Sequence, residues 1–313
     1  MKNAKNAFSR FGFGQLAGMA AIMLVSLAMT PLVKPGALEQ LIQNVSPSVI
    51  LALIYVPNLG FLLAYWLVVR NLPKAQWQKQ PMSAGALLKI YVMMYAVATI
   101  LNLLGGSVSG MAPEGGSQQL EMINQIVNTK LITGILIPTL AAPVLEELIF
   151  RKLMIDRLHN YGEGTVILFS ALCFGLFHGN LTQFVYATGV GLFLGYVYCK
   201  TGKVIYTIVM HMLLNSMGSL VMLLGPAMQG GAESAALTAI VFTVVVIGLI
   251  VTGLVMLIVS LKKKYFVLDN AMPEAIAKSE VLKTAYLNPG VMLLFAVYLA
   301  QIVVSLFDIQ LPF

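Results

Sequence analysis

The sequence is poor in charged side chains. It has 19 Lys and Arg and 12 Asp and Glu in 313 residues, about 10%, whereas a soluble domain carries roughly 25%. Hydrophobic residues make up 59% of the chain. A soluble protein of this length would lack the polar side chains needed to cover its surface. The composition therefore predicts an all-α polytopic integral membrane protein and argues against a soluble enzyme.

Cysteines and familiar signature motifs are also scarce. The two cysteines, Cys173 and Cys199, lie in apolar runs without a CxxC pair, so we expect small buried hydrophobes and no disulfide framework. There is no GxGxxG, P-loop, EF-hand or HExxH motif. The net charge of +7 is typical of membrane proteins with basic cytoplasmic loops. It does not require a nucleic-acid partner, and we expect none.

Long apolar runs are abundant. Nine of them have about the 17–25 residues needed to cross a hydrocarbon core of roughly 30 Å. The fourth run is long and the fifth is short, so eight spans remain an alternative. The runs cover approximately residues 14–33, 47–69, 84–104, 131–158, 164–178, 181–199, 204–224, 235–261 and 287–310.

Basic residues fall in alternate loops, a pattern that predicts a cytoplasmic N-terminus and nine spans. The first run has about 19 apolar residues, longer than the roughly 7–15 of a signal peptide, which favours an uncleaved span. No organelle address is present, and this favours a bacterial plasma membrane. Residues 105–119 and 225–233 are expected to be flexible external loops. Residues 120–127 are expected to form a short interfacial helix or the start of the fourth span.

Charged residues inside a span cost several kcal/mol and therefore mark function. Glu146 and Glu147 are adjacent in the fourth run and point about 100° apart on a helix, so both can border one cavity. Glu147 and Arg151 are four residues apart and can form an ion pair. Such a pair of carboxylates suits a general base that activates water. A structural ion cluster at a helix end is the alternative.

Two of the three histidines lie within or at the edge of apolar runs. His178 closes the fifth run. His211 and Asn215 share a face in the seventh run and could donate hydrogen bonds to an oxyanion. The alternatives are a packing or capping role for His178 and interhelical hydrogen bonding for His211 and Asn215.

These groups can lie at one height in the bundle. The fourth and fifth spans are expected to turn near Tyr161-Gly162. Glu146 lies 15 residues before position 161, and His178 lies 17 residues after it. At about 1.5 Å per residue, both lie at similar distances from the turn. His211 follows the next expected turn, near Gly202, and reaches the same level if the hairpin of the fourth and fifth spans projects into the cytoplasm.

The motifs resemble those of the CPBP family of intramembrane proteases, also called the ABI or CAAX-protease-and-bacteriocin-processing family, which includes the type II CAAX prenyl endopeptidase. The resemblance covers about residues 130–225. It divides the chain into N-terminal helices with an external loop (1–129), a catalytic core (130–225) and C-terminal helices with a cytoplasmic loop (226–313). Many family members have Gly where this chain has Lys152. The matching motifs are Glu146-Glu147-x-x-x-Arg151, Phe174-x-x-x-His178 and His211-x-x-x-Asn215.

The resemblance implies a glutamate-dependent protease that hydrolyses membrane-associated proteins or peptide precursors. Glu146 would activate water, Glu147 and Arg151 would support it, and His178 would position the water. His211 and Asn215 would stabilise the oxyanion. No cofactor is implied in this scheme. The ligand types also permit a zinc version with Glu146, His178 and His211 as ligands.

Two functions from other classes remain open. A non-catalytic membrane scaffold or bacteriocin immunity factor would work by binding alone, because a shared fold does not guarantee activity. A proton-coupled transporter could also use buried Glu and His side chains. The oligomeric state and the identity of the substrate are not readable from the residues.

Overall fold

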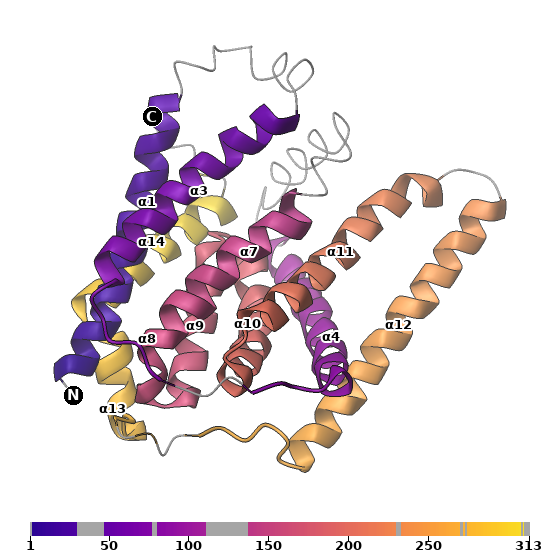
Figure 1. Ribbon diagram of the computed structural model, residues 1–313. Helices are drawn as coiled ribbons and strands as arrows, with labels where there is room; N and C mark the ends of the chain where they lie inside the picture. The colour runs from indigo at the N-terminus through magenta and orange to yellow at the C-terminus, as the bar shows by residue number, and fades with distance from the viewer. Residues whose placement is uncertain are drawn as a thin grey trace.

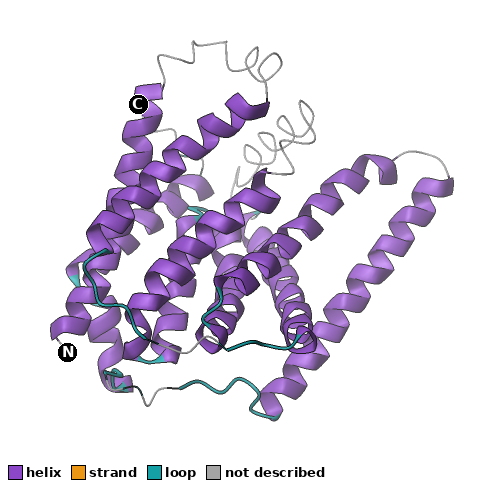
Figure 2. Ribbon diagram, viewed as in Figure 1, coloured by secondary structure: helices purple, strands orange, loops and turns teal. Residues whose placement is uncertain are grey.

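The structure is a computed structural model that describes residues 2–29, 47–76, 80–110, 137–229, 233–269, 272, 274–307 and 309. These residues form helices joined by short connections, and none of them forms a strand (Figure 2). Four helices are long and apolar enough to cross a membrane, and three shorter ones are apolar. The chain is therefore an all-α integral membrane protein, as its composition predicts.

Each of the nine predicted spans has a helical counterpart (Figure 1). The fourth consists of several helical segments in succession, and a short helical segment precedes the last. The helices are α1 (Lys2–Met29), α3 (Pro47–Val69), α4 (Ala84–Ser109), η2 (Ile137–Ala141), α7 (Ala142–Glu147), η3 (Leu148–Ile155), α8 (Asp156–Leu158), η4 (His159–Tyr161), α9 (Glu163–Phe177), α10 (Leu181–Thr201), α11 (Val204–Gln229), α12 (Glu233–Lys262), α13 (Lys278–Val281), η5 (Leu282–Tyr286) and α14 (Pro289–Leu306).

Several predicted boundaries were wrong. Helix α1 begins at Lys2, twelve residues before the predicted span. Phe8 lies on this extension and packs edge-on against Phe169, with ring centroids 4.8 Å apart, so tertiary contacts stabilise it. Residues 105–109 and 225–229, predicted as loop, continue α4 and α11, since helix satisfies backbone hydrogen bonds that lipid cannot. Gly110 caps the C-terminal end of α4. Residues 111–119 and 230–232 of the predicted loops, and the predicted interfacial helix at 120–127, lie outside the described residues.

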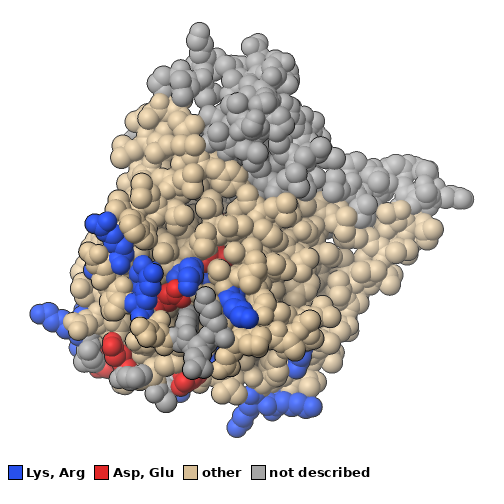
Figure 3. All heavy atoms as spheres, viewed as in Figure 1, with Lys and Arg blue, Asp and Glu red and all other residues tan. Residues whose placement is uncertain are grey.

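The basic segments predicted to share one side of the membrane do lie at one end of the bundle. Figure 3 shows Lys and Arg side chains over the lower part of the visible face, and residues other than Lys, Arg, Asp and Glu over the described surface above it. Hydrogen bonds join these segments to one another. They link Ala75 N to Asp156 O (2.7 Å), Gln80 N to Thr201 O (3.0 Å), Ile276 N to Tyr161 O (3.2 Å) and the Arg10 side chain to Val68 O.

Helix α14 runs parallel to α1 and packs against it. Gly290 N donates to Ser9 Oγ (3.0 Å) near the basic end, and Tyr298 Oη donates to Gln15 Oε1 (3.2 Å) two turns further along. The first and last helices therefore start at the same end of the bundle. With an odd number of spans, the first and last helices cross the membrane in the same direction, as these two helices do. At the other side of the bundle, α12 is the outermost helix in Figure 1.

The centre of the bundle contains the helix of residues 137–161 and the α9–α10 hairpin. The turn between η4 and α9 is made by Gly162, as predicted, with φ of 103°, a conformation that favours glycine. Phe150 of η3 packs edge-on against Phe174 of α9, with ring centroids 5.3 Å apart. These helices bring the predicted motifs into the interior, and both cysteines are buried and unpaired as predicted.

Candidate functional site

The two adjacent glutamates lie at the end of α7, in a helix of irregular pitch. The turns on either side of α7, η2 and η3, are π-helical. Pro138 and Pro143 lack an N–H donor and clash with the carbonyl four residues earlier, which favours such widened turns. Widened turns are frequent at functional sites. Here they precede and follow Glu146 and Glu147.

Glu147 and Arg151 form the predicted ion pair. Glu147 Oε2 lies 3.0 Å from Arg151 Nε, and both side chains are completely buried. The guanidinium carbon of Arg151 lies 4.7 Å from the ring centroid of Phe174 on α9, so the ring face contributes a cation–π contact. A buried carboxylate needs such a partner, because an isolated charge in this environment would be costly.

His211 of α11 lies between the two carboxylates. Its Nδ1 atom is 3.0 Å from Glu147 Oε1, and its Nε2 atom is 3.6 Å from Glu146 Oε2. A carboxylate only accepts hydrogen bonds, so Nδ1 carries a proton. With both glutamates ionised, Arg151 balances one negative charge. The second is balanced when His211 is an imidazolium or when Glu146 takes up a proton.

His178 of the predicted motif also contacts Phe174. The rings of His178 and His211 both contact Phe174 edge-on, with centroids 5.1 and 5.6 Å from it. His178 Nδ1 lies 2.9 Å from the Phe174 carbonyl oxygen, so Nδ1 is the donor. In a neutral imidazole, Nε2 of His178 is then an acceptor. Phe174 therefore packs against the Arg151 cation and both motif histidines.

Asn215 lies one turn after His211 on the same face of α11 and is half-buried. One further turn along this face, Ser219 Oγ lies 2.7 Å from Thr139 Oγ1 of η2. This hydrogen bond joins α11 to the helix that carries the glutamates. It helps to hold His211 and Asn215 against that helix.

Close packing of α9 on α10 positions the helix that carries His178. A Cβ atom at Gly175 would lie 2.1 Å from Thr188 Oγ1 and 2.7 Å from the Phe184 carbonyl oxygen. No larger residue fits there without displacing backbone. The requirement for glycine three residues before His178 is visible only in the tertiary structure.

Three further residues face the carboxylates and were not predicted from the sequence. Thr207 lies close to Glu147, although its hydroxyl donates to the Val204 carbonyl at 2.9 Å, and the phenol groups of Tyr55 and Tyr186 lie within electrostatic range of Glu146. Thr207 lies four residues before His211, a spacing that places both on one helix face. No comparable spacing points to Tyr55 and Tyr186, because they come from α3 and α10.

The zinc alternative needs three ligands around one point. Among the residues that the structure describes, no three side chains of His, Cys, Asp or Glu are arranged to hold one metal ion. Glu146 and His211 lie close together, and the bond from His178 Nδ1 to the Phe174 carbonyl leaves its Nε2 atom as the possible ligand. The three predicted zinc ligands nevertheless do not form a group of this kind.

Comparisons with known proteins agree with the motifs. The family model described as type II CAAX prenyl endopeptidase Rce1-like matches residues 128–217, which include all six predicted site residues. The chain is also similar to "Putative membrane peptidase YdiL" of Bacillus subtilis (strain 168), with 24% identity over 164 residues. The resemblance to the CPBP family is confirmed.

The CPBP-like part does not extend over the whole molecule. The match to the Bacillus subtilis protein covers 50% of this chain and 65% of the relative, less than two thirds of its length. The family model leaves α1, α3, α4, α12 and α14 outside its matched residues. No solved structure matches the chain.

Proposed function

We propose that the chain is an intramembrane endopeptidase that uses glutamate-activated water. The observation that carries this function is the imidazole of His211 between two adjacent carboxylates, 3.0 Å from Glu147 and 3.6 Å from Glu146. Amide hydrolysis needs a base for water and a donor for the oxyanion. Glu146 and His211 are one such pair.

Exposure assigns different roles to the two glutamates. The Glu146 side chain is 17% exposed, whereas that of Glu147 is 0% exposed and paired with Arg151. Glu146 can therefore meet water and act as the base. Glu147, held by Arg151, accepts from His211 Nδ1–H and fixes the orientation of the ring, as a buried carboxylate orients a catalytic histidine. It also stabilises the imidazolium form, in which Nε2–H is a second donor.

The reaction then proceeds by addition and elimination. Water adds its oxygen to the scissile carbonyl carbon, and Glu146 takes up one of its protons. The tetrahedral oxyanion accepts hydrogen bonds from His211 Nε2–H and from the Asn215 amide. The intermediate collapses, the C–N bond breaks, and the proton on Glu146 passes to the leaving amine. His178, with Nε2 as an acceptor, positions the attacking water.

The substrates are membrane-associated proteins or peptide precursors. The site lies among apolar helices, toward the end of the bundle where the basic segments gather. By the positive-inside rule this end faces the cytoplasm, and the lack of an organelle address in the sequence favours a bacterial plasma membrane. The proposed reaction is of the same class as the activities named in the matched family and relative.

The test compares the membrane peptidomes of cells that express the wild-type chain, Glu146→Gln or His211→Ala. The matched control is Glu280→Gln, which changes a partly exposed glutamate on α13. Substrates should accumulate uncleaved with both site variants but not with the control. The purified protein should cleave peptides from these substrates, with Glu146→Gln reducing the rate by at least about 10³-fold, as expected for loss of a general base.

Three outcomes contradict the proposal. Full cleavage by both site variants at normal protein levels would reject glutamate-dependent hydrolysis. A cellular phenotype that survives Glu146→Gln without cleavage would favour the scaffold or immunity function. Substrate flux in proteoliposomes would instead support a transporter.

A further inference from the structure

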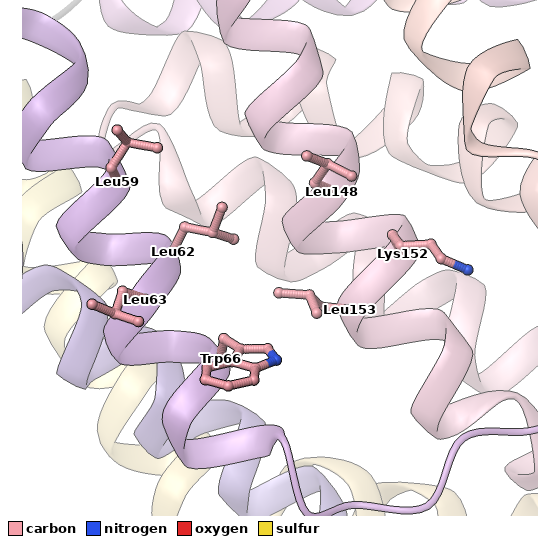
Figure 4. A pocket seen from close by; sticks show the side chains of 7 residues that line it. All are labelled: Leu59, Leu62, Leu63, Trp66, Leu148, Lys152 and Leu153. Atoms are coloured by element: carbon pink, nitrogen blue, oxygen red, sulfur yellow. The ribbon is translucent and has the colours of Figure 1, made fainter. Parts of the chain in front are cut away.

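A groove of about 330 Å³ lies between α3 and the helix that carries the glutamates (Figure 4). This volume is within the range of small-molecule sites, roughly 300–1,000 Å³. Its walls are Leu59, Leu62, Leu63 and Trp66 of α3, and Leu148, Lys152 and Leu153 of η3.

The groove is apolar and open to the side of the bundle. Leu59, Leu63 and Trp66 are 53%, 58% and 40% exposed, and α3 is an apolar helix of the membrane bundle. The occupant therefore meets hydrocarbon side chains along most of the groove. Figure 4 shows the ammonium end of Lys152 turned away from α3, so this residue contributes its methylene chain to the wall.

Helix α3 and the helix that carries the glutamates converge at the C-terminal end of α3. Arg157 Nε donates to the Val69 carbonyl at 3.0 Å, and the Arg10 side chain donates to the Val68 carbonyl. These bonds close the groove at the basic end of the bundle. Toward Leu59, which lies two turns before Trp66 on α3, the groove continues between the helices.

The closed end is positively charged. The exposed Arg70 lies one turn beyond Trp66, and its guanidinium carbon is 5.4 Å from the centroid of the Trp66 ring. Arg10 and Arg157 donate to carbonyls at the same helix end, whereas Lys152 points away from α3 and is paired with Asp156 at 2.6 Å. Among the described residues, three arginines thus gather at this end of α3.

We propose that the groove binds an anionic phospholipid, with an acyl chain along the leucines and the phosphate on Arg70. A zwitterionic lipid would fit the walls equally well, but it would not balance the excess of cations at the closed end. Trp and Arg at this depth are typical of the membrane interface, where headgroups lie. Basic pockets between transmembrane helices bind anionic headgroups. Leu148 of the groove directly follows Glu147, so the lipid contacts the helix of the candidate site.

Trp66 reports occupancy directly. The chain has two tryptophans, so a Trp77→Phe background makes Trp66 the sole fluorophore. The protein is reconstituted in phosphatidylcholine vesicles with increasing fractions of dibrominated phosphatidylglycerol or dibrominated phosphatidylcholine, whose bromines quench tryptophan on contact. Phosphatidylglycerol should reach half-maximal quenching at about a fivefold lower fraction, as expected for one basic residue at the headgroup.

Three variants identify the source of the preference. Arg70→Gln should bring the two lipids to the same midpoint, while Arg70→Lys should retain most of the preference. Lys262→Gln, which removes a basic residue in the last turn of α12, is the matched control and should retain it fully. Unchanged quenching of Arg70→Gln by brominated phosphatidylcholine shows that this variant keeps the groove intact.

Equal midpoints for both lipids in the Trp77→Phe protein would overturn the proposal, as would a preference that Arg70→Gln leaves unchanged. Absence of quenching by either lipid would also overturn it. The inference does not rest on the proposed proteolysis. A Glu146→Gln protein should bind the lipid normally, so failure of one proposal leaves the other testable.

Discussion

His211 Nδ1 lies 3.0 Å from Glu147 Oε1, although the two residues are 64 positions apart in the chain. The other carboxylate oxygen of this residue, Glu147 Oε2, lies 3.0 Å from Arg151 Nε. One buried carboxylate thus holds a cation from its own helix and an imidazole from α11. This geometry couples the charge balance of the site to the packing of two helices. The contribution of each partner to stability can therefore be measured by mutation.

Replacing Arg151 with Ala should destabilise the protein by about 3–5 kcal/mol, because it leaves the fully buried Glu147 without its cation. Unfolding of the purified protein in detergent with increasing SDS measures this loss. Glu147→Leu/Arg151→Met should recover most of the stability, because an apolar pair of similar volume replaces a buried ion pair at little cost. The double variant should remain inactive. A fully stable Arg151→Ala protein would show that the ion pair does not stabilise the fold.

Gly175→Ala should loosen the α9–α10 hairpin. The added Cβ atom would lie 2.1 Å from Thr188 Oγ1 and 2.7 Å from the Phe184 carbonyl, and overpacking of this kind costs about 1–3 kcal/mol. Adding Thr188→Ala should restore part of the loss, since only the side-chain clash is removed. The unfolding midpoints of the wild type, Gly175→Ala and Gly175→Ala/Thr188→Ala measure both effects.

The control for this series is Gly248→Ala on α12, where a Cβ atom would meet nothing within 4 Å. The free energy of unfolding of this variant should stay within about 0.5 kcal/mol of the wild-type value. Equal effects at the two glycines would mean that the close approach at Gly175 does not limit packing.

Peptide cleavage should persist in the presence of a strong chelator such as 1,10-phenanthroline. Arg151 and a protonated His211 can together balance Glu146 and Glu147 without a metal ion. Cleavage rates with and without chelator, measured on peptides found by the peptidome comparison, provide the test. Loss of activity that added zinc restores would reject the metal-free mechanism and reinstate the zinc alternative.

The end of the bundle that carries the basic segments should face the cytoplasm. In intact cells, a membrane-impermeant maleimide should label Ser107→Cys, near the end of α4, but not Lys263→Cys, just after α12. Inverted membrane vesicles should give the opposite result. Cys173 and Cys199 are 0% and 7% exposed, so the native thiols should contribute little background. Labelling of Lys263→Cys from outside would invert the assigned orientation.

Much of the fold follows from local patterns. Each of the nine apolar runs of membrane-spanning length corresponds to a helix or a succession of helical segments among the described residues. The turn at Gly162 was confirmed at the expected place. Helix ends were predicted less well. The extension of α1 to Lys2 depends on Phe8 packing against Phe169, a contact between residues 161 positions apart. No pattern within the first ten residues distinguishes a packed helix from a basic loop.

The candidate site was likewise predicted only in part. Spacing of four residues predicted the ion pair of Glu147 with Arg151 and the shared face of His211 and Asn215, since these are properties of one helix. The interactions of Tyr55 and Tyr186 with Glu146 could not be predicted, because they depend on how separate helices cross. The phenol groups carry no charge that would mark them in an apolar run.

By itself, the sequence determined that this chain lies in a membrane and which few polar residues are buried there, because the energetic cost of charge in lipid makes them conspicuous. The tertiary structure alone decided that His211 reaches both glutamates and that Phe174 contacts Arg151 and both motif histidines. It also decided that a groove opens beside the glutamate helix. These features depend on distances between helices, which are set by side-chain packing and not by the order of residues along any one of them.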